Sequence, residues 1–269
     1  MNWQDLTSDQ FPAAVKAAEG VCLVPLGCLE RHAHHLPLGT DKLIASEVCR
    51  RAAGLEPAVV FPDYFFTQIL EARHYPGCIG LEPDLILALL ENVCGEIARN
   101  GLEKIVLVNA HGGNGSFLTY FAQAQLASRR EYVVYVWDLF GLADLLPEDA
   151  GVKTQWETTV DGHAGERETS QILAFRPELV HLEAIPAEPE GMPLERLKSL
   201  RDAGVYTAIW WYGDHPTHFR GDAHPATAEK GSRLLDARAR ALAAAMRAIK
   251  LDQQARRLQD EFYDAVEGD

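Results

Sequence analysis

Four short and almost uninterrupted apolar runs constrain the fold of this 269-residue chain more than any other feature of its sequence. They cover residues 21–26, 58–61, 105–108 and 132–137, and three of them end at Gly27, Asn109 or Asp138. Between them, at residues 42–53, 84–100 and 116–129, apolar side chains recur at three- and four-residue steps, which is typical of amphipathic helices. Strands that are apolar on both faces and alternate with helices indicate a mainly parallel sheet with helices on both sides. We therefore predict an α/β fold.

The rest of the chain adds helices and shows no sign of a second domain. Residues 227–262 are rich in Ala, Arg and Leu and predict one or two long helices. No internal repeat, low-complexity linker or shift in composition divides the sequence. Because 269 residues is near the upper limit for one hydrophobic core, we predict a single domain over residues 1–269.

The charge and the cysteines argue against several classes of protein. The 25 basic and 39 acidic residues give a formal net charge of −14, whereas surfaces that bind nucleic acid or anionic membranes need clustered Lys and Arg. No apolar stretch reaches the ~18 residues of a membrane span. The five cysteines are an odd number without a Cys-x-x-Cys pair, which argues against a disulfide framework or a zinc knuckle. We expect a soluble, cytoplasmic protein that binds neither nucleic acid nor membranes.

Polar clusters follow the first, third and fourth predicted strands, where parallel sheets bind their ligands. The first cluster holds three imidazoles and two carboxylates: Glu30, His32, His34, His35 and Asp41. Glu30 and His32 are two residues apart, so on an extended segment they project to the same side. A turn with Pro and Gly before Asp41 can fold the chain back onto them. Carboxylate and imidazole together suit zinc, manganese or iron, so the cluster predicts a metal site.

The other two clusters place histidines next to glycines. His111 is followed by two glycines, which let the backbone pass close to a ligand. His163 precedes a predicted helix over residues 169–175, with Glu168 at its first turn and Glu166 in the glycine-containing loop. Carboxylates at that position compensate the helix dipole, and we expect Glu166 to be exposed to solvent.

In this order and spacing, the clusters resemble the motifs of the creatininase (creatinine amidohydrolase) family. The family's motifs are E-x-H-G-x-H-L-P-x-x-x-D, E-H-x-x-F-P-G-T, N-G-H-G-G-N and H-A-G-x-x-E-T-S. The segments that match them are Glu30-Arg-His32-Ala-His34-His35-Leu-Pro-Leu-Gly-Thr-Asp41, Glu71-Ala-Arg-His74-Tyr-Pro-Gly-Cys78, Asn109-Ala-His111-Gly-Gly-Asn114 and His163-Ala-Gly-Glu166-Arg-Glu168-Thr-Ser170. The resemblance spans about residues 20–180, and as a set these motifs are highly specific.

The resemblance implies a three-layer α/β/α fold with two divalent metal ions per chain, zinc, manganese or iron, and a homo-oligomer, often a hexamer. Carried onto this sequence, it implies that Glu30 and His111 bind one metal, that His32 binds the second, and that Asp41 bridges both. In creatininase proper, a glutamate two residues after the N-G-H histidine binds the second metal, but a glycine stands there in this chain. The role is therefore carried to Glu168, the glutamate of E-T-S.

The activity that this resemblance predicts is hydrolysis of a C–N bond in a small, cyclic amide, with a metal-activated water as the nucleophile. His163 is predicted to carry the water's proton to the leaving nitrogen, and Glu166 to orient His163. Creatininase proper has an aromatic residue that contacts the substrate ring where this chain has Gly112, and Cys78 replaces the family's hydroxyl residue. We therefore do not expect creatinine itself to be the substrate.

Several alternatives stay open at this stage. Within hydrolases, the chain could be a formamide hydrolase or could open the ring of a cyclic ketone or sugar derivative. A mononuclear iron oxygenase or peptide-modifying enzyme would need only two imidazoles and one carboxylate. A metal-stabilised protein without catalytic activity is a third class.

Further aromatic and histidine residues lie outside the three clusters. Residues 210–224 contain two tryptophans and three histidines and predict a loop near the pocket, a subunit contact or simple packing. Trp156 lies shortly before His163 and could line the pocket. His35 and His74 match positions of the family motifs, where they could support metal ligands or contact the substrate.

Overall fold

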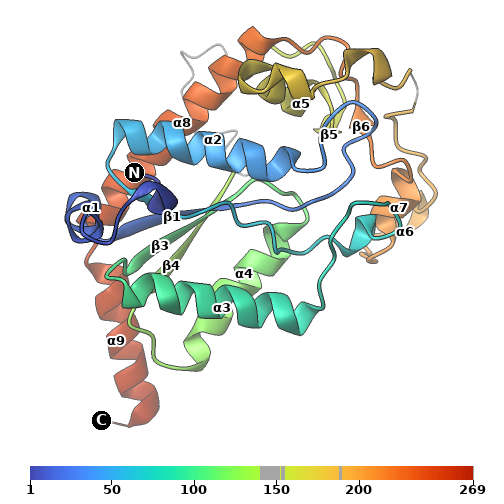
Figure 1. Ribbon diagram of the computed structural model, residues 1–269. Helices are drawn as coiled ribbons and strands as arrows, with labels where there is room; N and C mark the ends of the chain where they lie inside the picture. Colours follow the sequence, from blue (N-terminus) through green and yellow to red (C-terminus); the bar gives the residue numbers. More distant parts are fainter. Residues whose placement is uncertain (140–151, 153–154, 188–189, 269) are drawn as a thin grey trace.

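A parallel sheet of four strands in the order β2-β1-β3-β4 forms the centre of the computed structural model, which describes residues 1–139, 152, 155–187 and 190–268 (Figure 1). The strands are β1 (Val21–Leu26), β2 (Val59–Val60), β3 (Lys104–Asn109) and β4 (Val133–Asp138). All three pairings in this sheet are parallel. The four apolar runs of the sequence are thus the strands of the sheet.

Helices cover both faces of the sheet, as predicted (Figure 1). On one face lie α2 (Thr40–Leu55), α5 (Glu166–Phe175) and α8 (Ala228–Leu251). On the other lie α1 (Phe11–Ala18), α3 (Pro83–Arg99) and α4 (Asn114–Ala124). The prediction of a three-layer α/β/α fold is confirmed.

The residues of β1 alternate between the two layers of helices. Val21 and Leu23 belong to the core under α2 and α8, whereas Cys22, Val24 and Leu26 belong to the core over α1, α3 and α4. Each of these five side chains is fully buried. Both faces of the strand therefore need apolar residues, which is why the run is uninterrupted in the sequence.

The structure corrects several predicted boundaries. The helix predicted over residues 116–129 ends as α4 at Ala124 and continues as a short 3-10 helix, Gln125–Ala127. α5 begins at Glu166, three residues earlier than predicted. The C-terminal stretch forms two helices, α8 and α9 (Gln254–Glu267), because the Asp252 carboxylate accepts hydrogen bonds from the backbone amides of Gln254 and Ala255 and so begins a new helix.

Several short elements were not predicted. β5 (Asp161–His163) and β6 (Arg220–Gly221) form a small antiparallel sheet, which brings two polar segments of the sequence together. Short helices are α6 (Lys198–Asp202) and α7 (Trp210–Asp214). The 3-10 helices are η1 (Trp3–Asp5), η2 (Leu70–Ala72), η5 (Pro177–Leu179) and η6 (Leu182–Ala184).

The register of the central sheet aligns the ends of its strands. Leu26 pairs with Asn109, and Asn109 pairs with Asp138, so β1, β3 and β4 end level with one another. The segments that follow them therefore leave the sheet at the same edge. In the segment after β4, residues 140–151 and 153–154 lie outside the described residues. No helix of the described part of the chain is long and apolar enough to cross a membrane.

Candidate metal centre

A tight turn after β1 brings Glu30, His32 and Asp41 together. The amide of Glu30 donates to the Leu38 carbonyl oxygen at 3.0 Å, and His32 forms an antiparallel bridge with Leu36. The chain then enters α2, and Asp41 lies in the first turn of that helix, where a carboxylate is stabilised by the helix dipole. All three predicted ligands are about 1% exposed, so the turn buries them rather than presenting them to solvent.

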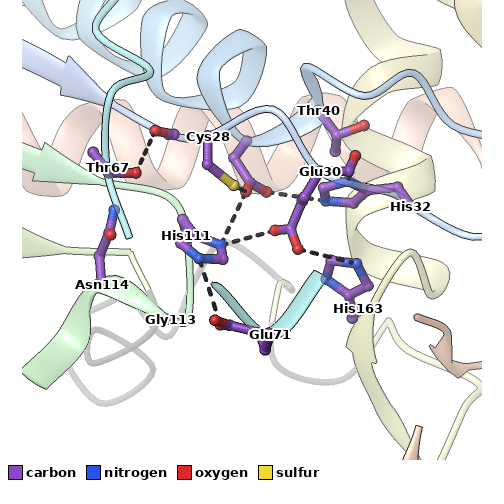
Figure 2. A network of polar contacts seen from close by, with 12 residues as sticks. Cys28, Glu30, His32, Thr40, Thr67, Glu71, His111, Gly113, Asn114 and His163 are labelled. Carbon is purple, nitrogen blue, oxygen red and sulfur yellow. Dashed lines mark hydrogen bonds and ion pairs between the residues drawn. The ribbon is translucent and has the colours of Figure 1, made fainter. Parts of the chain in front are cut away.

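Glu30, Asp41 and His111 form the first group of candidate ligands. Figure 2 shows Glu30 and His111 directed toward each other. His111 Nδ1 lies 2.8 Å from Glu30 Oε1 and 3.2 Å from Asp41 Oδ2. Cys28, which the sequence analysis did not single out, joins this group because its thiol donates to Asp41 Oδ2 at 3.1 Å. Only its position two residues before Glu30 marked it in the sequence.

His32 and Glu168 belong to a second set of possible metal donors, together with His163. Asp41 lies next to His32, and we call His32, Asp41 and Glu168 the second group. His32 Nε2 lies 3.0 Å from Asp41 Oδ1 and 3.7 Å from Glu168 Oε2. Asp41 therefore directs one carboxylate oxygen to each group. The amide of Ala164 donates to Glu168 Oε2 at 2.6 Å, which fixes the carboxylate beside His32. Burial raises the pKa of Glu168 to about 7.

His163 lies beside both groups. Its ring centroid is 4.2 Å from that of His32, and its Nε2 is 3.9 Å from Glu30 Oε2. Nε2 lies 2.8 Å from the carbonyl oxygen of Arg31, which only accepts hydrogen bonds, so Nε2 holds the ring's proton and Nδ1 carries the lone pair. Burial and the positive charge of His32 lower the pKa of His163 to about 3, so the ring is neutral near pH 7.

Glu166 points away from this centre. It is fully buried, so the expected solvent exposure was wrong. Its carboxylate accepts hydrogen bonds from Lys230 Nζ at 2.5 Å, from the amides of Glu157 and Thr158 at 3.0 Å, and from the Thr158 hydroxyl at 2.9 Å. Among the contacts of the described residues, none joins Glu166 to His163, and Glu166 instead ties α5 to α8.

Of the remaining candidate residues, some contact the elements around the centre and others are exposed or pack elsewhere. His35 is buried, with Nε2 2.9 Å from the Thr169 hydroxyl of α5, whereas His34 and His74 are exposed. Trp156 packs against the apolar residues of α8. The segment 210–224 does reach the centre, because His218 Nε2 lies 2.8 Å from Glu30 Oε2. In the sequence, only the histidines and tryptophans of this segment indicated a role near the centre, and they did not indicate which of them would reach it.

The donor atoms fit divalent cations. Glu30, Asp41 and Glu168 are all nearly buried, yet no Lys or Arg of the described chain forms an ion pair with any of them. Glu30 Oε1 and His111 Nε2 lack hydrogen-bond partners among the described residues. Glu30 Oε1 and His111 Nδ1 lie 2.8 Å apart without forming a hydrogen bond. Imidazoles and not Lys or Arg face these buried carboxylates, and both kinds of side chain bind divalent cations, so the centre is suited to bind metal.

Comparison with known proteins identifies the family. The family described as creatininase, creatinine amidohydrolase, matches residues 4–246. The chain belongs to the creatininase family. Members of this family are amidohydrolases, so the chain is an enzyme of that class, and the resemblance seen in the motifs is confirmed.

Named relatives support the assignment, and solved structures share the fold. The creatinine amidohydrolase of Pseudomonas putida is 28% identical over 202 residues, which cover 69% of this chain and 75% of that protein. The mycofactocin precursor peptide peptidase of Mycobacterium ulcerans (strain Agy99) is 30% identical over 237 residues, which cover 85% and 83%. A crystal structure of creatinine amidohydrolase (creatininase) has the same fold, with a TM-score of 0.74 at 24% identity over 94% of this chain and 98% of that chain.

Creatininase structures named for a Zn-Zn form and a Mn form also share this fold. Their TM-scores are 0.75 and 0.72, each at 24% identity over 93% of this chain. The matches cover 98% and 99% of the two creatininase chains. These names show that metal occupies creatininase itself. For this chain, the described residues supply the candidate ligands.

Gly113 stands at the position where the motif resemblance implies a glutamate in creatininase proper. A β-carbon on Gly113 would lie 2.5 Å from both Glu71 Oε1 and His111 Nε2. The Glu71 carboxylate, to which Gln68 Nε2 donates at 2.9 Å, already fills that space (Figure 2). Besides Asp41, the carboxylate that lies beside His32 is that of Glu168 in α5.

Proposed function

We propose that this enzyme binds two divalent metal ions and hydrolyses a C–N bond of a small, cyclic amide. The observation that carries the proposal is the position of Asp41, with Oδ2 in the first group and Oδ1 in the second. A carboxylate between two sets of ligands is suited to bridge two cations. Zinc, manganese and iron all accept this mixture of oxygen and nitrogen donors.

In this proposal Glu30 and His111 would hold one ion, His32 and Glu168 would hold the other, and Asp41 would serve both. Three carboxylates then offset most of the charge of two dications. When bound, such ions polarise a substrate carbonyl and activate water. The burial of these ligands supports the proposal, because a dry site strengthens each electrostatic interaction in it.

His163 is the proposed proton carrier. Its neutral ring holds a proton at Nε2, directed to the Arg31 carbonyl oxygen, and leaves Nδ1 able to accept the proton of the attacking water. The same atom would then deliver that proton to the leaving nitrogen. Trp211, with its ring centroid 5.6 Å from that of His163 in an edge-to-face arrangement, shields the imidazole on one side. Glu166 has no part in this proposal, because its carboxylate is bound to Lys230.

A peptide substrate is the second candidate. It is favoured by the 30% identity to a mycofactocin precursor peptide peptidase over 85% of this chain. Hydrolysis of a peptide C–N bond would use the same ligands and the same proton carrier. The difference would lie in the size of the substrate and not in the metal centre.

Metal reconstitution followed by a substrate panel tests the proposal. Protein stripped with a chelator and reloaded with zinc or manganese should bind about two ions per chain, measured by elemental analysis. The loaded enzyme is then incubated with small lactams, formamides, cyclic ketones and short peptides, and the formation of new amine, ammonia or carboxylic acid is followed. Metal-free protein is the matched control.

The outcomes separate the alternatives. One iron per chain and consumption of oxygen would support a mononuclear iron enzyme and contradict the proposal. Two ions with turnover of short peptides alone would support the peptidase. Two ions with turnover of cyclic amides would support the first candidate. Light scattering of the same sample tests the predicted homo-oligomer, for which a hexamer is expected.

A further inference from the structure

The two carboxylate oxygens of Glu30 face different histidines. Oε1 lies 2.8 Å from His111 Nδ1 in the first group and has no hydrogen-bond partner among the described residues. Oε2 lies 2.8 Å from Nε2 of His218, which comes from the segment before β6. His218 is only 1% exposed. A ring nitrogen of His218, an oxygen of Glu30 and a ring nitrogen of His163 also lie close enough together to suggest a further metal site.

Trp211 decides whether His218 donates a hydrogen bond to Glu30 or binds a metal ion. The indole Nε1 of Trp211 donates to His218 Nδ1 at 3.0 Å. An indole N–H can only donate, so Nδ1 must carry a lone pair, and the neutral imidazole holds its proton on Nε2. That proton is then donated to Glu30 Oε2. A nitrogen that holds a proton has no lone pair for a cation, so His218 cannot bind metal through Nε2 while Trp211 is in place.

We infer that His218 is a positioning residue for the metal ligand Glu30. Trp211 sets the tautomer of His218 that lets it donate to Glu30. The hydrogen bond from His218 occupies Oε2 and leaves Oε1 as the atom directed at the first metal. Outer partners of this kind orient a ligand and tune its affinity for metal. This inference rests on the proposed metal centre.

The backbone around His218 supports this role. His218 has a φ of +57°, a left-handed conformation that costs energy in a non-glycine residue. It is held by hydrogen bonds from its own amide to the His215 carbonyl oxygen and from the Ala33 amide to the His218 carbonyl oxygen. Arg31 Nε also donates to the Thr217 carbonyl oxygen at 2.9 Å. The segment with His218 is thus fastened to the turn that carries Glu30.

Nuclear magnetic resonance of histidine labelled with ¹⁵N tests the tautomer directly. In metal-free protein, His218 should show a proton on Nε2 and an unprotonated Nδ1. Titration with zinc should leave the Nε2 proton in place while the signals of His32 and His111 change. Loss of the Nε2 proton on zinc binding would make His218 a ligand and overturn the inference. If zinc does not bind, the proposed function is contradicted. The inference is tested separately, because a proton on Nδ1 of His218 in the metal-free protein would contradict the assigned tautomer.

Two substitutions at His218 measure what the hydrogen bond does. His218→Leu removes the donor and should weaken the tighter zinc site by ~10- to 100-fold. His218→Gln keeps an N–H near the position of Nε2 and should recover most of that affinity. Equal loss in both variants, at unchanged stability in urea, would contradict a hydrogen-bonding role.

Trp211→Phe is the matched variant that keeps an aromatic ring and removes only the indole donor. With that donor gone, His218 should populate both tautomers, visible as protonation at Nδ1 in the same spectra. Zinc affinity should fall by less than in His218→Leu. An unchanged Nε2 tautomer in Trp211→Phe would show that the indole does not set the tautomer of His218. The Trp211→Phe variant also keeps the inference testable if His218→Leu fails to fold.

Discussion

Gly27 at the end of β1 lies directly against the backbone of Lys42 in α2: a β-carbon on Gly27 would lie 2.3 Å from the Lys42 amide nitrogen. It would also lie 2.7 Å from the carbonyl carbon of Asp41. Only a residue without a side chain permits this approach. The contact places Asp41 at the end of the sheet, between the two groups of ligands.

Gly27→Ala should push the start of α2 away from the sheet. We expect a loss of about 1–3 kcal/mol in the free energy of unfolding, because an added methyl in a packed site strains its surroundings. Zinc affinity should fall in the same variant, measured by competition with a chromophoric chelator. Gly54→Ala in the same helix is the control, since nothing lies within 4 Å of its added β-carbon. Wild-type stability and affinity in Gly27→Ala would contradict the role given to this contact.

Asp41→Ala should reduce metal content more than Glu30→Ala or His32→Ala. Asp41 lies in both groups, so its removal takes a ligand from each ion and leaves their charges unscreened. Elemental analysis after reconstitution should find at most about one ion per chain. Full occupancy in Asp41→Ala, with an empty site in either single-group variant, would show that Asp41 does not bridge.

Glu168→Gln and Glu166→Gln should separate metal binding from stability. Glu168→Gln should weaken one of two zinc sites, because it removes charge beside His32. Glu166→Gln should keep both ions and lower the free energy of unfolding in urea by about 1–3 kcal/mol, since Lys230 loses a charged acceptor. The opposite pattern, with metal lost only from Glu166→Gln, would exchange the two assignments.

His163→Ala should keep both metal ions and lose turnover. A proton carrier of this kind contributes ~10²- to 10⁴-fold to rate. Metal content and turnover are measured on the same preparation, with His34→Ala as the control, because His34 is exposed and lies outside the two groups. Parallel loss of metal and activity in His163→Ala would make His163 a ligand.

Zinc affinity should rise with pH. Burial lowers the pKa of His32, but the Asp41 carboxylate outweighs burial and raises it to about 10, so metal-free His32 is protonated at neutral pH. A cation must displace this proton, and each step toward higher pH makes the displacement easier. Calorimetry in buffers of different ionisation enthalpy should detect proton release, with affinity rising from about pH 6 to pH 9. Affinity that is constant over this range would contradict the ion pair.

The order of strands and helices and the main candidate ligands could be predicted because their signals are local. An uninterrupted apolar run predicts a strand buried on both faces, as for β1. Glu30, His32 and Asp41 lie within one turn of chain, so their spacing alone brings them close together. The aligned ends of β1 and β3 then add His111, because parallel strands place their carboxyl ends at one edge.

Only the tertiary structure decided the contacts between segments that are distant in the sequence. Glu166 and Lys230 are 64 residues apart and meet only because α5 packs on α8, so a carboxylate that looked exposed in the sequence became a buried ion pair. Glu30 and His218 are 188 residues apart, and no spacing or periodicity links them. The sequence by itself determined the sheet, its layers and the chemistry of the ligands, since these follow from patterns within a few residues. The partners of each ligand depended on how the layers pack, which is a property of the whole fold.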